Sequence, residues 1–138
     1  MTYLDDRLAE LRIHLDHLDE VRRRIASPGD LRRDRSLDND LRHSLLLVCQ
    51  RVIDIAGELS TRRRLRFEDY SEAIRNLAIY EELSDSLIRR LEPLPDLRNA
   101  LVHGNGLVEP AHLMSALDHL DEVERFADTV ERMGVRRR

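Results

Sequence analysis

The chain has 138 residues, which is long enough for one domain to bury a hydrophobic core of its own. With aromatic residues at 4%, no Trp, and only 5 Gly and 4 Pro, the composition excludes a β fold of many short strands and predicts an all-α protein with an aliphatic core. All 23 basic residues are arginine and the formal net charge is −4. The overall field therefore does not attract nucleic acid, and any RNA-binding surface has to be a local cluster.

The sequence also bears on the compartment of the protein. Its first residues are acidic and lack the basic and then apolar order of a signal peptide, and no apolar run reaches the ~18 residues of a membrane span. The only cysteine, Cys49, lies in an apolar run, so we expect a core residue and no intrachain disulfide. These features predict a cytoplasmic protein without a membrane partner.

Spacings of three and four between apolar residues predict two long helices in the first half of the chain. The first covers residues 4–25 and ends at Ser27-Pro28-Gly29, and the polar residues 30–36 predict a connector or a frayed turn. The second covers residues 37–59, and its wide apolar stripe predicts the most central position in the fold. A basic loop is expected over residues 60–66.

The second half predicts shorter segments. A helical region over residues 70–91, unbroken or with one internal break, is ended by Pro93 and Pro95. Asp96 is the expected N-cap of a short helix that runs to His103, and Gly104 is expected to stop this helix in a left-handed conformation.

The final helix is predicted to begin near Pro110, and residues 136–138 are expected to form a disordered tail. Four main helices with short connections, together with the short helix before Gly104, predict a single domain (1–138) folded as an antiparallel up-and-down helical bundle. The first apolar stripe has nearly heptad spacing, so it suits packing within the bundle or between subunits.

The most informative segment is Arg98-Asn99-Ala100-Leu101-Val102-His103. At about 100° per residue, Asn99 and His103 share a helix face with Arg98 beside them, and we expect Leu101 and Val102 to point inward. Imidazole titrates near ~6.5 and guanidinium donors match phosphate oxygens. RNA carries its own nucleophile, the 2′-hydroxyl, so these groups suit its cleavage without a metal or other cofactor. An arginine and a histidine five apart are also common by chance, and spacing alone favours an ordinary surface pair.

Other polar clusters have weaker functional interpretations. The arginines within 22–24, 32–35 and 62–66 suit either phosphate contacts or, more simply, solvated faces.

Some histidines and acids also have alternative interpretations. A metal site at His14 and His17 of the first predicted helix lacks a second pair of ligands. The histidines of the last predicted helix suit a surface or an interface, and they are His112 and His119. Asp54 and Glu58 of the second predicted helix suit the border of a cleft, capping, or pairing with arginine, and Gln50 suits an interface.

The motif and three further segments resemble a known family. The superfamily motif is Arg-x4-6-His with a polar residue after the arginine, as in Arg98, Asn99 and His103, and residues 52–59, 70–74 and 91–110 complete the pattern before the final helix. The chain resembles HepT-like toxins of the HEPN superfamily, the ribonuclease half of HEPN–MNT toxin–antitoxin pairs. The resemblance covers most of the chain and implies a helical bundle that dimerises with both motifs facing one cleft.

The same resemblance implies an activity and a partner. The activity is that of a metal-independent endoribonuclease toxin of a type VII-like pair, acting on tRNA or mRNA, with Arg98 and His103 catalytic and Asn99 in support. The partner is an MNT-type nucleotidyltransferase antitoxin. One position departs from the family pattern: a tyrosine that the antitoxin modifies with AMP usually stands two residues after the histidine, where this chain has Asn105. Silencing by that modification is therefore in doubt, and three alternatives stay open: silencing by contact, modification of another residue, or an activity that has drifted.

Two alternatives to an RNA-cleaving dimer stay open. One is a non-catalytic helical module that docks a nucleotidyltransferase, which fits the absence of the tyrosine. The other is a structural dimer in which the arginine and histidine of the motif are buried in mutual packing.

Overall fold

The computed structural model describes residues 2–104 and 108–136 of the chain, and these residues form helices and no strand. The all-α prediction is therefore confirmed for the described residues. In chain order the elements are α1 (Tyr3–Arg22), α2 (Pro28–Arg33), α3 (Arg35–Arg62), α4 (Tyr70–Arg75), the 3-10 helix η1 (Asn76–Ile79), α5 (Asp85–Leu91), α6 (Leu94–His103), α7 (Pro110–Leu117) and α8 (Leu120–Arg136).

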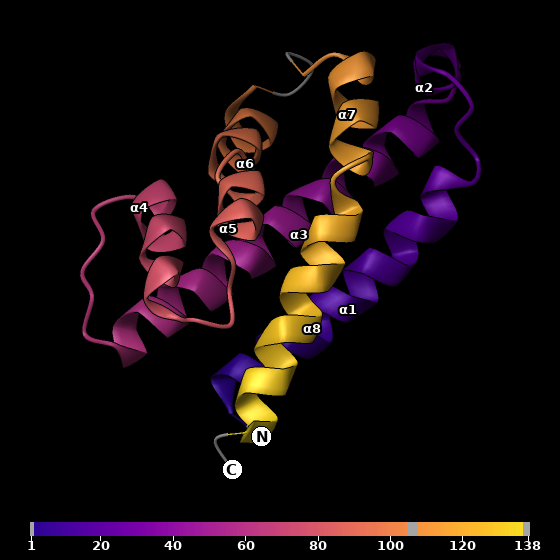
Figure 1. The fold of residues 1–138 in the computed structure, drawn as a ribbon. Helices are drawn as coiled ribbons and strands as arrows, with labels where there is room; N and C mark the ends of the chain where they lie inside the picture. Colours follow the sequence, from indigo (N-terminus) through magenta and orange to yellow (C-terminus); the bar gives the residue numbers. More distant parts are fainter. Residues whose placement is uncertain (1, 105–107, 137–138) are drawn as a thin grey trace.

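The long helices α1, α3 and α8 form the body of the molecule (Figure 1). Helix α1 packs along α3, and α8 packs along α1. The short helices α4 and α6 also contact α3, and α2 and α7 contact each other at the opposite end of α3 from α4. Because α1, α2, α4, α6 and α7 all contact it, α3 is the central helix that its wide apolar stripe predicted.

The core lies mainly between α1 and α3. The predicted stripe of α1 is buried from Leu4 to Val21, and that of α3 is buried from Leu37 to Leu59. Cys49 is also buried, as predicted, and burial raises the pKa of its thiol to about 12, so it behaves as a small apolar residue. No helix that the structure describes is both long enough and apolar enough to cross a membrane.

The connector expected after α1 is a helix instead. Pro28 occupies the first turn of α2, where its missing N–H costs nothing. The carboxylate of Asp30 accepts hydrogen bonds from the backbone N–H groups of Ala26 and Ser27, at 2.7 and 3.1 Å. Leu31 is buried and anchors this turn. Pro28 and Gly29 therefore end α1 and also begin the next helix, which the polar composition of residues 30–36 did not indicate.

Helix α3 is longer than predicted and takes in the first part of the expected basic loop. The Asp34 carboxylate accepts a bond from the Leu37 N–H and caps its start. The third helical region does break, since α4 and η1 end at Ile79 and α5 starts at Asp85 behind a Ser84 cap.

Helix α6 begins two residues before the predicted cap. Leu94 and Pro95 lie in its first turn, where a proline lacks no hydrogen bond that the helix would make, so Asp96 is a first-turn residue and not the N-cap. Gly104 ends the helix as predicted, and its N–H donates to the Ala100 carbonyl at 2.8 Å. Its φ is −113°, so the left-handed conformation expected there is wrong.

The predicted final helix is two helices. At the junction the N–H groups of Asp118 and His119 donate to Ser115 and Ala116, three residues back, which tightens one turn. The apolar stripe continues across the junction, from Leu117 to Leu120, so its spacing alone does not reveal the break. Arg136 ends α8 rather than starting a tail, and residues 137–138 lie outside the described residues.

One buried side chain closes the C-terminal end of α3. Carbonyl groups in the last turn of a helix lack intrahelical partners, and the Tyr80 hydroxyl donates to the Leu59 carbonyl at 2.6 Å. The Tyr80 ring is 1% exposed, and the Arg63 guanidinium lies over it at 4.6 Å.

Removing the hydroxyl of Tyr80 is therefore expected to destabilise the protein. Tyr80→Phe should lower the free energy of unfolding in urea by about 1–3 kcal/mol, the usual cost of a buried acceptor that loses its donor. Tyr3→Phe, at a half-exposed ring on α1, is the matched control and should change it by less than about 0.5 kcal/mol. Equal effects of the two substitutions would contradict the role given to Tyr80.

The seam between α1 and α3 holds a cluster of titratable groups. His17 Nε2 lies 2.7 Å from Asp40 Oδ1. His14 is half-buried, and desolvation together with the charge of Arg51 lowers its pKa, outweighing the opposite effect of Glu10; His43 and His17 also lower the pKa of His14.

The lowered pKa of His14 makes the protein less stable in acid. The unfolded chain binds a proton at His14 at a higher pH than the folded chain, so stability falls as the pH drops through the ordinary histidine value of ~6.5 towards the lowered folded value. We expect His14→Gln to reduce the loss of unfolding free energy between pH 8 and pH 5. Urea unfolding of both proteins at several pH values measures this, and parallel curves would contradict it.

Candidate active site on helix α6

The motif lies on α6, which packs against the central helix α3. Leu94 and Leu101 are buried, and Leu97 and Ala100 are partly buried against the core. Val102 is 40% exposed, so the expectation that it points inward is wrong. One residue corresponds to about 100° around a helix, and the burial of Leu101 turns Val102 away from α3.

Arg98 is the best-fixed member of the motif. It is half-buried, and its Nε–H donates to Gln50 Oε1 on α3 at 3.0 Å. One of its terminal nitrogens, Nη1, donates to Asn99 Oδ1 at 3.1 Å. The guanidinium carbon also lies 5.8 Å from the centre of the Tyr70 ring. Contacts from α3, α4 and α6 therefore orient this guanidinium.

Asn99 and His103 are exposed on the same helix. His103 is the last residue of α6, and its imidazole makes no hydrogen bond or ion pair with another described residue. A solvent-facing imidazole can exchange protons with a bound substrate. The structure thus carries Arg98, Asn99 and His103 on one short helix, with the first constrained and the other two accessible. Asn105 lies outside the described residues.

Gln50 joins the motif to a chain of charged residues. Its Nε2 donates to Asp54 Oδ1 at 2.8 Å, and Asp54 pairs with Arg51 at 3.2 Å. Arg51 also reaches Glu10 on α1, at 3.0 Å. Gln50, expected at an interface, therefore bonds within the chain, and Asp54 pairs with arginine, which is one of the roles predicted for it. Glu58 does the same, with Arg62 at 3.3 Å.

Tyr70 is a site neighbour that the sequence pattern did not identify. It begins α4, and α4 is held against α3 where the buried Ser60 hydroxyl donates to the Ala73 carbonyl at 3.2 Å. No spacing rule connects a residue at position 70 with one at position 98, so the contact depends on tertiary packing. The tyrosine is 39% exposed and offers its ring to solvent beside the motif.

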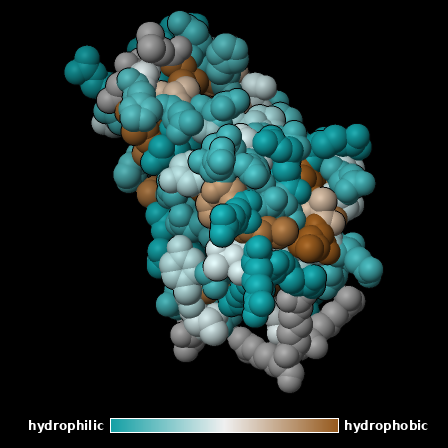
Figure 2. Space-filling view, turned by 90° about the vertical axis from the view of Figure 1, so that its left-hand side faces the viewer, coloured by the Kyte–Doolittle hydropathy of each residue, from teal (hydrophilic) through white to brown (hydrophobic). Residues whose placement is uncertain are grey.

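An open hollow of about 540 Å³ separates the start of α4 from α6. Its lining is mostly polar and includes Tyr70, Ser71, Asp96 and Asn99. The face of the molecule around α4 is largely hydrophilic, with only scattered apolar patches (Figure 2).

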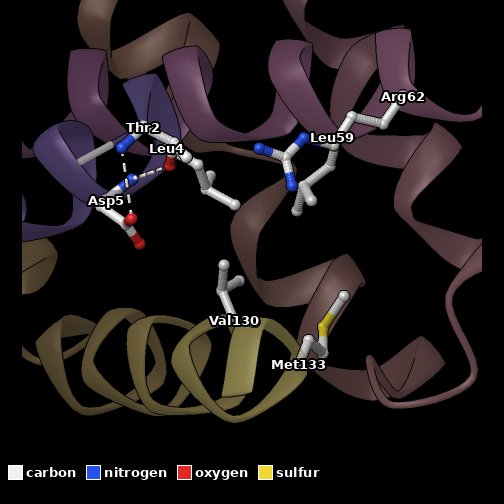
Figure 3. Close-up of a pocket in the computed structure, with 8 residues that line it drawn as sticks. Thr2, Leu4, Asp5, Leu59, Arg62, Val130 and Met133 are labelled. Carbon is white, nitrogen blue, oxygen red and sulfur yellow. Dashed lines mark hydrogen bonds between the residues drawn. The ribbon is translucent and has the colours of Figure 1, made fainter. Parts of the chain in front are cut away.

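Two other hollows lack this polar character. One of about 430 Å³ lies between α6 and α7, with an apolar floor and the predicted surface histidines, His112 and His119, in its lining. The other, of about 210 Å³, lies between the start of α1, the end of α3 and α8, where Leu4, Leu59, Val130 and Met133 line it (Figure 3). The second lining includes no motif residue.

The remaining candidates support no site. Among the described residues no group of three or more His, Cys, Asp or Glu side chains is placed to hold a metal ion, and His17 of the predicted pair bonds to Asp40. The arginines within 22–24, 32–35 and 62–66 are exposed, as solvated faces require. Three of them pair with acids: Arg22 with Asp118, Arg33 with Asp30, and Arg62 with Glu58.

The fold is similar to that of solved toxin–antitoxin proteins. One similar chain belongs to a toxin–antitoxin complex with AMP-PNP; it is 20% identical, the match covers 94% of this chain and 97% of that one, and the TM-score is 0.78. Another belongs to the complex of the tri-AMPylated Shewanella oneidensis HEPN toxin with its MNT antitoxin, at 19% identity, 96% and 99% coverage and a TM-score of 0.81. No curated protein sequence matches significantly.

The family model described as ribonuclease HepT-like matches residues 11–130, which include the whole motif and most of every long helix. The chain therefore belongs to the HepT-like ribonuclease family.

Proposed function

We propose that this protein is a metal-independent endoribonuclease and the toxin of a type VII-like toxin–antitoxin pair. The observation that carries the proposal is the arrangement of α6, where an oriented guanidinium at Arg98 and an accessible imidazole at His103 lie five positions apart on one short helix. Asn99, which accepts a bond from Arg98, supports the guanidinium. Membership in a family of ribonucleases gives this arrangement its substrate class.

The proposed reaction uses the 2′-hydroxyl of the RNA as the nucleophile. His103 takes its proton, and the 2′-oxygen attacks the neighbouring phosphorus atom while Arg98 stabilises the negative charge that develops on the phosphoryl oxygens. The bond to the 5′-oxygen then breaks, and that oxygen takes a proton from the imidazolium. The products are a 2′,3′-cyclic phosphate and a 5′-hydroxyl. The chemistry is complete without a metal ion or other cofactor.

Further proposals concern the assembly and its setting. The chain is proposed to act as a homodimer with both motifs facing one cleft, which would supply two imidazoles to a single substrate. The family model covers nearly the whole chain, which supports one domain. A cytoplasmic location is also proposed, because the proposed substrates, tRNA or mRNA, are present there.

Substitutions in the motif should abolish cleavage without unfolding the protein. We expect Arg98→Ala and His103→Ala each to lower kcat/KM for RNA by about 10²-fold or more, the usual loss when a charge-stabilising group or a general acid–base is removed. Purified proteins incubated with total RNA and tRNA in EDTA provide the measurement. The same substitutions should relieve any growth arrest on expression.

Two exposed residues offer matched controls for this experiment. Arg89→Ala on α5 and His112→Ala on α7 remove the same side-chain types outside the motif, and both should retain full cleavage. If the two motif variants degrade RNA as fast as the parent, the proposed active site is wrong. If the parent itself does not cleave while it binds a nucleotidyltransferase, the chain is a non-catalytic docking module.

The proposed partner is an MNT-type nucleotidyltransferase antitoxin, because the solved HEPN toxin of similar fold forms a complex with one. Position 105 is an asparagine, which has no phenolic oxygen to accept AMP. We therefore propose that the antitoxin silences this toxin by contact.

Silencing by contact predicts a toxin whose mass does not change. The protein co-expressed with the neighbouring nucleotidyltransferase should purify as a complex, with no RNA cleavage and the intact mass of the unmodified chain. Separation of the two chains should restore cleavage. A mass increase equal to one or more AMP groups, with cleavage still absent after separation, would contradict this mode of silencing.

A further inference from the structure

Among the residues that the structure describes, Gln50 is the one side chain outside the motif that bonds to the guanidinium of Arg98. It lies half-buried near the middle of α3, 48 positions before the arginine, and its Oε1 accepts the Arg98 Nε–H at 3.0 Å. The other end of the same amide, Nε2, donates to Asp54 Oδ1 at 2.8 Å. An amide nitrogen only donates and a carboxylate only accepts, so Asp54 determines which end of Gln50 faces Arg98.

Asp54 is itself held in place. It pairs with Arg51, Arg51 reaches Glu10, and Glu10 accepts a bond from Arg7 at 2.6 Å. These two acids and two arginines form a network of ion pairs that is neutral overall and connects α1 to α3. Because this network ends at the neutral amide of Gln50, it orients Arg98 without supplying a counter-charge.

Within the described residues, both hydrogen-bond partners of Arg98 are carboxamides. Gln50 takes the Nε–H and Asn99 takes one N–H of Nη1, and no carboxylate of the described residues pairs with this arginine. Several other arginines do pair with carboxylates, among them Arg12, Arg42 and Arg51. A guanidinium has five N–H donors, so the two amides leave the rest of the fork and the full positive charge for another ligand.

We infer that Gln50 is a positioning residue, which fixes the Nε side of Arg98 and leaves its remaining donors and its charge for one phosphate of the RNA backbone. This inference rests on the proposed ribonuclease function. It adds a specific requirement: the residue at position 50 has to accept a hydrogen bond and also has to be neutral. A carboxylate there would hold the guanidinium but offset its charge, and it would face the Asp54 carboxylate. A thioether would offset no charge but would release the guanidinium.

Two substitutions separate orientation from charge. Gln50→Met keeps the length of the side chain and removes the acceptor, whereas Gln50→Glu keeps an acceptor and adds a negative charge. Asn39→Met, at an exposed amide on the same helix, is the matched control. Thermal unfolding tests whether all three variants fold like the parent.

The first readout is independent of catalysis. The Nε–H of Arg98 gives its own signal in ¹⁵N–¹H NMR spectra, assigned by its loss in Arg98→Ala. In the parent, in Asn39→Met and in Gln50→Glu this hydrogen should be protected from exchange with water, and in Gln50→Met protection should be lost.

The second readout is the interaction with RNA. An oligonucleotide with 2′-O-methyl groups cannot be cleaved, and Gln50→Glu should bind it about tenfold more weakly than the parent, because the charge of Arg98 is offset. Gln50→Met should change this affinity less than about threefold, but it should lower kcat on cleavable RNA about tenfold, as expected when a group that stabilises the transition state is misplaced.

Different results would contradict the role of Gln50 and the proposed ribonuclease function. If the Arg98 signal in Gln50→Met is as protected as in the parent, or if Gln50→Glu binds the oligonucleotide as tightly as the parent, Gln50 is not a positioning residue for a phosphate-binding arginine. If the parent fails to cleave any RNA, the proposed ribonuclease function is wrong. The exchange and binding measurements still decide what Gln50 does in that case.

Discussion

The fold depends on the burial of the apolar stripe of α3. This stripe is buried from Leu37 to Leu59, because α1, α6 and other short helices pack against α3. At about 25 cal/mol for each Å² of apolar surface removed from water, this burial is the main source of stability. The same helix also carries Gln50 at a half-buried edge of the core. The candidate site is therefore built directly on the most constrained element of the protein.

The spacing of apolar residues predicted the helices that bury one face, and it did not predict helix boundaries that depend on local backbone geometry. The stripes of α1 and α3 are buried as predicted, because a helix packed on one face repeats apolar residues every three or four positions. The apolar period continues through the break between α7 and α8 and through the start of α6 at Leu94. The spacing of apolar residues therefore does not reveal either boundary. The helix at residues 28–33 depends on Pro28 and the Asp30 carboxylate, which also suit the turn that was predicted.

The motif of the candidate site was predictable from the sequence, but the contacts that its residues make with other helices were not. Arg98, Asn99 and His103 are close in the sequence, and helical geometry alone places them on one element. The contacts that orient Arg98 come from Gln50 on α3 and Tyr70 on α4, which are far from it in the sequence and meet it only through packing. Among the described residues, Arg98 is held by amides and not by a carboxylate, which supports the proposal that its charge is kept for a substrate. That property connects the packing of α3 with the proposed chemistry on RNA.

A single 2′-deoxynucleotide in the substrate tests directly whether the 2′-hydroxyl is the nucleophile. A cleaved RNA is resynthesised with a single 2′-deoxynucleotide on the 5′ side of the cut, and its products are compared with those of the unmodified RNA by mass spectrometry. If the 2′-hydroxyl is the nucleophile, the unmodified RNA should give a 2′,3′-cyclic phosphate and a 5′-hydroxyl in EDTA, and the modified RNA should not be cut at the deoxynucleotide. Cleavage at the deoxynucleotide, or products with a 5′-phosphate, would contradict it.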